Sequence, residues 1–161
     1  MAVLDVLSFT AITSTIGLFL CGIPICQQIR QRGSTEGISA FPFLLGSISS
    51  FFWLRYGFLK GDNSVVTVNG VGFTLQIIYL TYYYVVARPK TTITRQISLI
   101  AGLSAAMVFY VRLYATDLPD VAVNHLGLMC MTLNILNFAA PLAGLRDVLR
   151  TQSTENLPFS P

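Results

Sequence analysis

The sequence predicts an all-helical membrane protein that crosses a bilayer several times, and two observations support this fold class. Five long, mostly apolar stretches fill most of the 161-residue chain, and each is close to the roughly 20 residues that a helix needs to cross the hydrocarbon core. Only 11% of the residues are charged and 53% are hydrophobic, whereas soluble domains carry about 25% charged residues. Since the charges gather in the gaps between the stretches, we expect a bundle of spanning helices.

The first stretch, residues 6–29, has some features of a secretory signal peptide. Asp5 is the only charge before it, so the basic region that opens a signal peptide is missing. The apolar run is also longer than the roughly 7–15 apolar residues of a signal peptide. We therefore expect a helix that stays in the protein.

Four further stretches follow at residues 41–59, 65–86, 97–114 and 126–145. They do not show the alternation of the roughly ten-residue strands in a membrane β-barrel, so they predict helices. Ser47, Ser49 and Ser50 lie in the second stretch, and Gly70 and Gly72 lie in the third. Small residues let membrane helices approach closely, so we expect the second and third helices to pack tightly in the bundle.

The distribution of basic residues predicts the orientation. Seven of the ten Lys and Arg residues fall on one side of the predicted bundle: Arg30, Arg32, Arg88, Lys90, Arg95, Arg146 and Arg150. The positive-inside rule places that side in the cytoplasm, so the N-terminus is expected to be extracellular or lumenal and the C-terminus cytoplasmic. Arg55 and Arg112 lie near the outer helix ends, where their side chains either reach the headgroups or serve a gate or ligand.

The sequence gives no support for catalysis, metal binding or nucleic-acid binding. No pair of carboxylates lies inside a helix, and the single histidine, His125, borders a loop. Cys21, Cys26 and Cys130 are odd in number and lack a ligand spacing, so we expect small core residues rather than a disulfide or a metal site. The net charge of +3 is accounted for by loop residues. We expect no enzyme activity, cofactor or metal.

An internal repeat organises the chain. A shift of 119 residues aligns Ser34-Thr35-Glu36 with Ser153-Thr154-Glu155, and each copy follows an odd-numbered helix. A three-helix unit ends on the side opposite its start, so one extra helix is needed before a parallel second copy. We therefore predict a three-helix unit at 6–86, a linker helix at 97–114 and the first helix of a second unit at 126–161, a plan found in transporters.

Several short motifs occur in a fixed order along the whole chain. They are Gly22-Ile23-Pro24, Ser34-Thr35-Glu36, Pro42-Phe43, Trp53-Leu54-Arg55-Tyr56-Gly57, Asp62-Asn63, Asn69-Gly70-Val71-Gly72, Ser153-Thr154-Glu155 and Pro158-Phe159. With these motifs the chain resembles the SWEET (MtN3/saliva) sugar transporters, most closely the animal members. The resemblance implies seven helices in a three-plus-one-plus-three order, of which this chain holds five.

The resemblance implies that Asn69 and Trp53 line the sugar pocket. An intramembrane amide both donates to and accepts from sugar hydroxyls, and an indole face packs on the apolar face of a sugar ring. Neither side chain is charged, which suits a neutral, glucose-like substrate. The alternatives are a helix–helix hydrogen bond for Asn69 and a place in the interfacial aromatic belt for Trp53.

Hinges and gates are implied in the same way. Pro42, Pro141 and Pro158 match three of four family prolines that act as hinges, because a missing N–H weakens a helix locally. Gly22 stands at the fourth position, and Pro24 follows two residues later. Tyr56 and Asp62 match residues near the outer gate, where the alternative is an ordinary wet loop.

The resemblance implies bidirectional facilitated diffusion of sugar by alternating access in the plasma membrane or the Golgi membrane. All seven acids lie at helix ends or in loops, which argues against a proton-driven pump. Membrane lipid and further SWEET-type units, as homo- or hetero-oligomers, are the expected partners. The alternative is a truncated, non-transporting isoform that modulates a full-length transporter. Related amino-acid carriers are a third reading, although the Pro-Gln pair expected of them is missing at Pro24 and Pro141.

Overall fold

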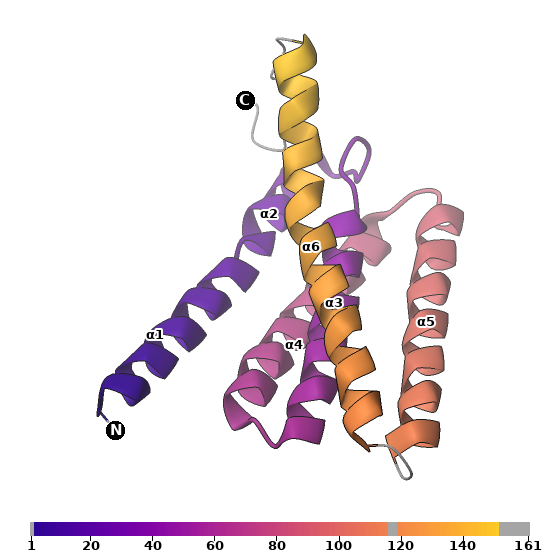
Figure 1. Cartoon of the computed structure of the whole chain (residues 1–161). Coiled ribbons are helices and arrows are strands. Elements are labelled where there is room, and N and C mark those ends of the chain that lie inside the picture. Colours follow the sequence, from indigo (N-terminus) through magenta and orange to yellow (C-terminus); the bar gives the residue numbers. More distant parts are fainter. Residues whose placement is uncertain (1, 116–118, 152–161) are drawn as a thin grey trace.

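The structure, a computed structural model, describes residues 2–115 and 119–151, with the side chains of 2–8, 11, 114–115, 119 and 138–151 left out. The described residues form six helices: α1 (Ala2–Phe19), α2 (Gly22–Arg32), α3 (Phe41–Lys60), α4 (Asn63–Val86), α5 (Thr91–Ala115) and α6 (Pro119–Thr151). No strand occurs among them, so the all-α prediction is confirmed. α1 begins at the end of the bundle opposite to the one where α6 ends (Figure 1).

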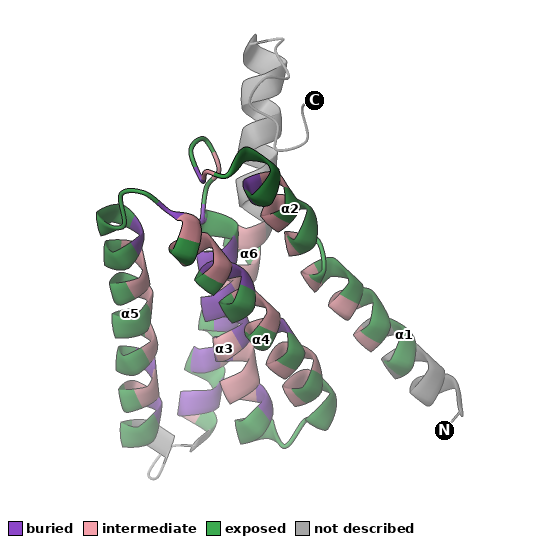
Figure 2. Ribbon diagram, turned by 180° about the vertical axis from the view of Figure 1, so that it is seen from behind, coloured by how far each residue is buried: buried purple, intermediate pink, exposed green. Residues whose placement is uncertain are grey.

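Helix α3 is the centre of the bundle. It packs against α4 along most of its length and also contacts α6 and α5, whereas α1 and α2 rest on α4 (Figure 1). Figure 2 shows that buried residues are most frequent on α3. The three serines Ser47, Ser49 and Ser50 are all buried there, as expected for small residues at close helix contacts.

The prediction of one helix over residues 6–29 is wrong, because the structure breaks that stretch at a turn over Leu20 and Cys21. Gly22 opens α2 directly beside the Tyr79 ring of α4, which occupies the space that a side chain at position 22 would fill. Pro24 lies in the first turn of α2, where its missing N–H removes no helix bond. The chain thus changes direction where Gly22 meets Tyr79, and α1 leans away from the bundle (Figure 1).

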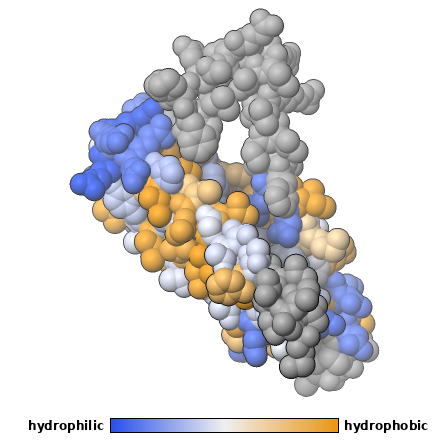
Figure 3. Space-filling model, turned by 90° about the vertical axis from the view of Figure 1, so that its left-hand side faces the viewer, coloured by the Kyte–Doolittle hydropathy of each residue, from blue (hydrophilic) through white to orange (hydrophobic). Residues whose placement is uncertain are grey.

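Three helical stretches of the described residues are long and apolar enough to cross a membrane by length and composition: Ile12–Arg32, Asn63–Val86 and Thr91–Leu113. Figure 3 shows apolar side chains over the middle of one side of the molecule and a hydrophilic group at one end. α3 is not among these stretches, because its serines and Arg55 lower its hydropathy. Its flanks are covered by other helices, so α3 needs less apolar surface than a lipid-facing helix.

The α3–α4 hairpin is antiparallel and closely packed. Gly61 ends α3 with a φ of 68°, a left-handed conformation that glycine adopts at no steric cost. The turn sets Gly57 against Val65 and Val66, and about three α-helical turns earlier in α3 Gly46 lies against Gln76. These contacts fix the register between the two helices.

Replacing Gly57 with Ala is expected to destabilise the hairpin. The new Cβ would lie 3.0 Å from Val65 Cγ1 and 3.1 Å from the backbone nitrogen of Val66, and neither atom can move cheaply. We expect a loss of about 1–3 kcal/mol, the usual effect of overpacking, seen as a lower thermal midpoint in detergent by circular dichroism. Gly70→Ala is the matched control, because its Cβ would come no nearer than 3.9 Å to Leu54. Equal midpoints for the two variants would contradict the packing argument.

The loop between α2 and α3 carries the first copy of the Ser-Thr-Glu repeat. Ser34 Oγ accepts a hydrogen bond from the Glu36 backbone N–H at 3.1 Å, and Thr35 is buried. The Tyr83 hydroxyl of α4 donates to the Ile38 carbonyl at 2.7 Å, which ties the loop to the bundle. The repeated motif is therefore a local turn, and its second copy lies outside the described residues.

Two apolar clusters hold the bundle together. One joins α3, α4 and the start of α5 and includes Phe43, Tyr79 and Ile93. The other joins α3, α5 and α6, and Cys130 is fully buried in it. The core role predicted for Cys130 is confirmed, Cys26 packs partly against the first cluster, and Cys21 is exposed, contrary to expectation.

Candidate functional site

A polar contact joins α3 to α6 inside the bundle. Trp53 Nε1 donates a hydrogen bond to Asn134 Oδ1 at 3.2 Å, and Ser49 Oγ donates to the same oxygen at 3.5 Å. Ser49 is only 6% exposed, and the Trp53 and Asn134 side chains are half-buried. Trp53 thus belongs to a contact between the predicted first unit and the first helix of the second unit.

Asn69 lies level with Trp53 on the neighbouring helix. The antiparallel register that sets Gly57 against Val65 and Val66 brings position 69 opposite position 53. Both positions lie roughly 10 Å from the loop that joins α3 and α4, counted at 1.5 Å per residue. The Asn69 side chain is half-buried, and its Nδ2 donates to the Val65 carbonyl at 2.9 Å, one turn earlier in α4.

The two amides leave complementary groups for a ligand. Asn69 uses a donor within its own helix, and among the described residues none donates to its Oδ1. Asn134 uses its oxygen for Trp53 and Ser49, and no described residue accepts from its amide nitrogen. A hydroxyl both donates and accepts, so the free groups of each amide suit a polyhydroxylated neutral ligand. The indole beside them offers an apolar face.

Tyr56 closes this region toward the α3–α4 loop. Its ring packs edge-on against Trp53, with centroids 5.5 Å apart and planes at 78°. Gly127 of α6 lies against the same ring, where an added Cβ would be 3.3 Å from Tyr56 Cε2. Two residues before Gly127 in α6, His125 Nδ1 is hydrogen-bonded to the hydroxyl of Tyr110 on α5. Aromatic rings thus cap the polar contact on this side.

Asp62 is the N-cap of α4. Its Oδ1 accepts from the backbone N–H groups of Ser64 and Val65 at 3.0 and 3.1 Å, which satisfies two of the unpaired donors that open a helix. No hydrogen bond joins Asp62 to Tyr56 in the described part of the chain. The predicted gate pairing of these two residues stays a prediction.

Variants of Asp62 separate capping from gating. Asp62→Ala should lower stability by about 1 kcal/mol, because it removes the cap, whereas Asp62→Asn should retain it. Thermal midpoints in detergent measure the difference, and sugar uptake is followed in parallel. If Asp62→Asn is as stable as the parent chain but takes up no sugar, the charge of the Asp62 carboxylate has a role in transport besides capping α4.

The predicted hinge prolines fall in different settings. Pro42 lies in the first turn of α3 and Pro24 in the first turn of α2, so both stand where a loop or turn enters a helix. Pro141 lies within α6, where the side chain is not described, and Pro158 lies outside the described residues. For Pro24 and Pro42, bending would occur at the helix entrance rather than inside the helix.

The fold and the site define an all-helical membrane protein with several candidate membrane-spanning helices and a polar contact between α3 and α6. The sequence model of one family, described as "Sugar efflux transporter for intercellular exchange", matches residues 5–91 and 124–161. The chain belongs to this MtN3/saliva, or SWEET, family. It is a family of transporters and not of enzymes.

Relatives and a solved structure agree with this assignment. "Sugar transporter SWEET1" of Caenorhabditis elegans is 45% identical over 157 residues, which cover 98% of this chain and 50% of the relative. "Sugar transporter SWEET1" of Drosophila pseudoobscura pseudoobscura is 38% identical over 96% of this chain and 69% of the relative. A solved eukaryotic SWEET transporter superposes with a TM-score of 0.73 at 28% identity, over 96% of this chain and 76% of its own. The chain thus spans half to about two thirds of these curated relatives.

Asn134 is the site residue that sequence reasoning missed. It lies within the apolar stretch 126–145, and amides inside membrane helices are uncommon enough to indicate a function by themselves. That signal was available, but the partners of Asn134 lie 81 and 85 residues away along the chain. Only the packing of α6 on α3 identifies them.

Proposed function

We propose that this chain forms part of a carrier for a neutral, glucose-like sugar, which moves in either direction by facilitated diffusion with alternating access. The supporting observation is the hydrogen bond from Trp53 to Asn134 beside Asn69, because it places an indole and two amides at one level inside the bundle. The relatives named as sugar transporters support the substrate class. The hinges at Pro24, Pro42, Pro141 and Pro158 and the gate at Tyr56 and Asp62 are part of this proposal.

The arrangement proposed for the whole chain is a three-helix unit at 6–86, a linker helix at 97–114 and the start of a second unit at 126–161. The two separate segments of the family match support it. The excess of Lys and Arg at one end supports a cytoplasmic C-terminus and an extracellular or lumenal N-terminus. The plasma membrane and the Golgi membrane are the proposed locations.

Uptake of labelled glucose into liposomes that contain only this chain tests the proposal. We expect Asn69→Ala to reduce uptake about tenfold, which corresponds to roughly 1.4 kcal/mol for a lost hydrogen bond in a buried site. Thr74→Ala is the matched control. The Thr74 hydroxyl also donates to the backbone carbonyl four residues earlier in α4, that of Gly70, but the Thr74 side chain is exposed. Uptake that requires an imposed pH or sodium gradient would contradict facilitated diffusion.

The second candidate function is that of a partner that associates with a longer SWEET-type transporter and modulates it without carrying sugar. The observation that favours it is the Trp53–Asn134 hydrogen bond between α3 and α6, because the matching helix of a longer relative can pack on the same face of α3. No uptake by the chain alone, together with altered uptake when a full-length relative is reconstituted with it, would support this alternative. Uptake by the chain alone that Asn69→Ala abolishes would support the first proposal.

A further inference from the structure

A long groove runs between α4 and α5, away from the polar contact of Trp53. Two hollows of about 310 Å³ and about 360 Å³ form it, and they share Ile77, Leu80 and Ile97. The groove opens at the surface, since Ile77 is 40% exposed. Each hollow is in the size range of small-ligand sites, about 300–1,000 Å³.

The lining of the groove suits hydrocarbon rather than sugar. Among the polar residues of its lining, Ser47 donates its hydroxyl proton to the Leu44 carbonyl at 2.8 Å, and Thr81 donates to the Ile77 carbonyl at 2.7 Å. Both groups are thus used within their own helices. Ser104 lies at one end of the first hollow and Thr94 and Ser98 line the second, and the other lining residues of the first hollow are aliphatic or aromatic, so a flexible acyl chain fits along its apolar floor.

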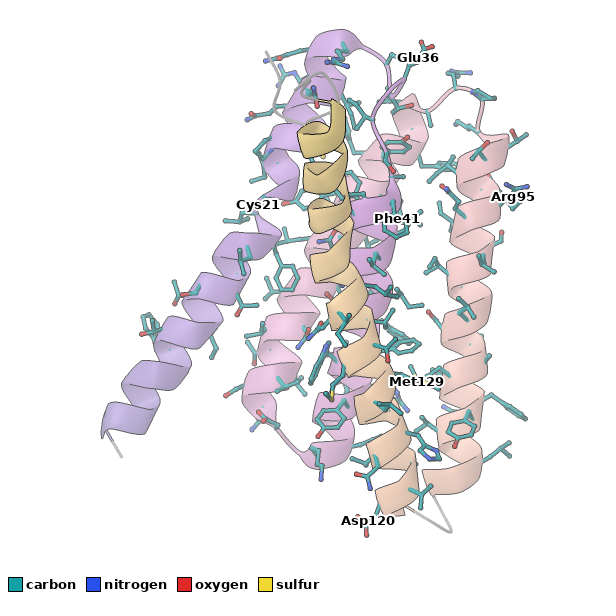
Figure 4. All side chains as sticks on the ribbon, turned by 45° about the horizontal axis from the view of Figure 1, so that its top comes forward. Cys21, Glu36, Phe41, Arg95, Asp120 and Met129 are labelled. Carbon is teal, nitrogen blue, oxygen red and sulfur yellow. The ribbon has the colours of Figure 1, made fainter. Side chains whose placement is uncertain are left out.

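The charge at one end of the groove suits an anion. Tyr84 lines the second hollow, and the Lys90 ammonium lies over its ring at 4.9 Å from the centroid. Arg88 and Arg95 are exposed near the same end, but Arg95 points away from the bundle (Figure 4). In the proposed orientation this end lies at the cytoplasmic leaflet, which carries the anionic lipids.

We infer that the α4–α5 groove binds an acidic phospholipid, with one acyl chain along Ile77, Leu80 and Ile97 and the phosphate beside Lys90. Lipid is the occupant because the groove combines an apolar floor, an opening toward the membrane and a cation at the headgroup level. Lys90 determines the preference for an acidic headgroup. Arg95 adds only to the general positive charge of that surface.

Native mass spectrometry of the full chain in neutral detergent tests this site with palmitoyl-oleoyl phosphatidylserine and the phosphatidylcholine that has the same tails. We expect phosphatidylserine to bind about fivefold more tightly, the effect of one cation near a lipid surface. Lys90→Ala should abolish the preference, and Arg95→Ala, with the same charge change, should retain it. Glycerophosphoserine, which is the headgroup without tails, should not be retained.

A second pair of variants tests the groove itself and does not depend on charge. Ala101 lines the first hollow, so Ala101→Leu should weaken the binding of both lipids, whereas Ala106→Leu on an exposed part of α5 outside the lining should not. Unchanged elution volume and helicity establish that the variants are folded. Four results would each overturn the inference. They are equal binding of the two lipids, equal effects of Lys90→Ala and Arg95→Ala, unchanged lipid binding in Ala101→Leu, and displacement of lipid by a second copy of the chain.

Discussion

Trp53→Ala should abolish sugar uptake by reconstituted protein. The substitution removes the indole face that packs on a sugar ring, the hydrogen bond to Asn134 and the edge-on contact with Tyr56. Large aromatic residues that are truncated at a binding site commonly cost about 2–4 kcal/mol, which corresponds to a reduction of roughly 30- to 1,000-fold. The uptake rate in liposomes measures the loss, and the amount of folded protein is matched by size exclusion.

The hydrogen bond and the ring can be tested separately. Trp53→Phe keeps an aromatic face but removes the N–H donor, so we expect an intermediate loss. Asn134→Ala removes the acceptor, and because both single variants break the same bond, the double variant should lose less than the two single effects combined. Fully additive losses in uptake would mean that Trp53 and Asn134 act on the sugar independently. If these variants have a lower thermal midpoint but normal sugar uptake, the Trp53–Asn134 hydrogen bond stabilises the fold and has no role in transport.

Gly22→Ala should detach the first helix from α4. The new Cβ would overlap the ring of Tyr79, which is only 6% exposed and is held on its other side by Phe43 at a centroid distance of 5.5 Å. Overpacking at a rigid ring costs about 1–3 kcal/mol, a large fraction of what holds α1 and α2 on the bundle. We expect faster labelling of Cys26 by a membrane-permeant maleimide, because Cys26 packs partly against the first core cluster.

Two controls accompany the Gly22 experiment. Gly17→Ala lies in the same predicted segment with no atom within 4 Å of the new Cβ, so labelling of Cys26 should be unchanged. Tyr79→Leu combined with Gly22→Ala should restore slow labelling, since the smaller side chain leaves space for the Cβ. If Gly22→Ala labels at the parental rate, the contact with Tyr79 does not hold the first helix.

Much of the fold could be predicted because hydropathy has a direct physical cause. Apolar stretches bounded by polar loops predict helices, so α3 and α4 fall within two residues of their expected ranges. α5 and α6 extend beyond the apolar stretches, because a helix can continue into the headgroup region with Thr, Arg and Asp on its surface. The break at Leu20 and Cys21 does not follow from hydropathy, which does not change there; its local cause is Pro24, which cannot donate to the Leu20 carbonyl four residues earlier, so that the Ile23 N–H bonds this carbonyl instead.

The candidate site could be predicted only in part, and through motifs rather than hydropathy. Asn69 and Trp53 are predicted through matching motifs, the structure places them level on two neighbouring helices, and their role with sugar stays a prediction. Asp62 is the N-cap of α4 through two local hydrogen bonds, and its place in a gate stays a prediction. Asn134 depends on contacts between residues far apart in the sequence, and a pattern along one chain contains no such information.

The buried serines and Arg55 of α3 bear on how the protein is inserted into the membrane. α3 leaves the ribosome before α4, yet its buried serines and Arg55 make it a weak candidate for entering lipid alone. Its polar groups are covered only after α4 has emerged and the tight turn at Gly61 has formed. We therefore expect α3 and α4 to enter the bilayer as a pair, so that a nascent chain truncated before Val86 should integrate α3 less efficiently than the full chain.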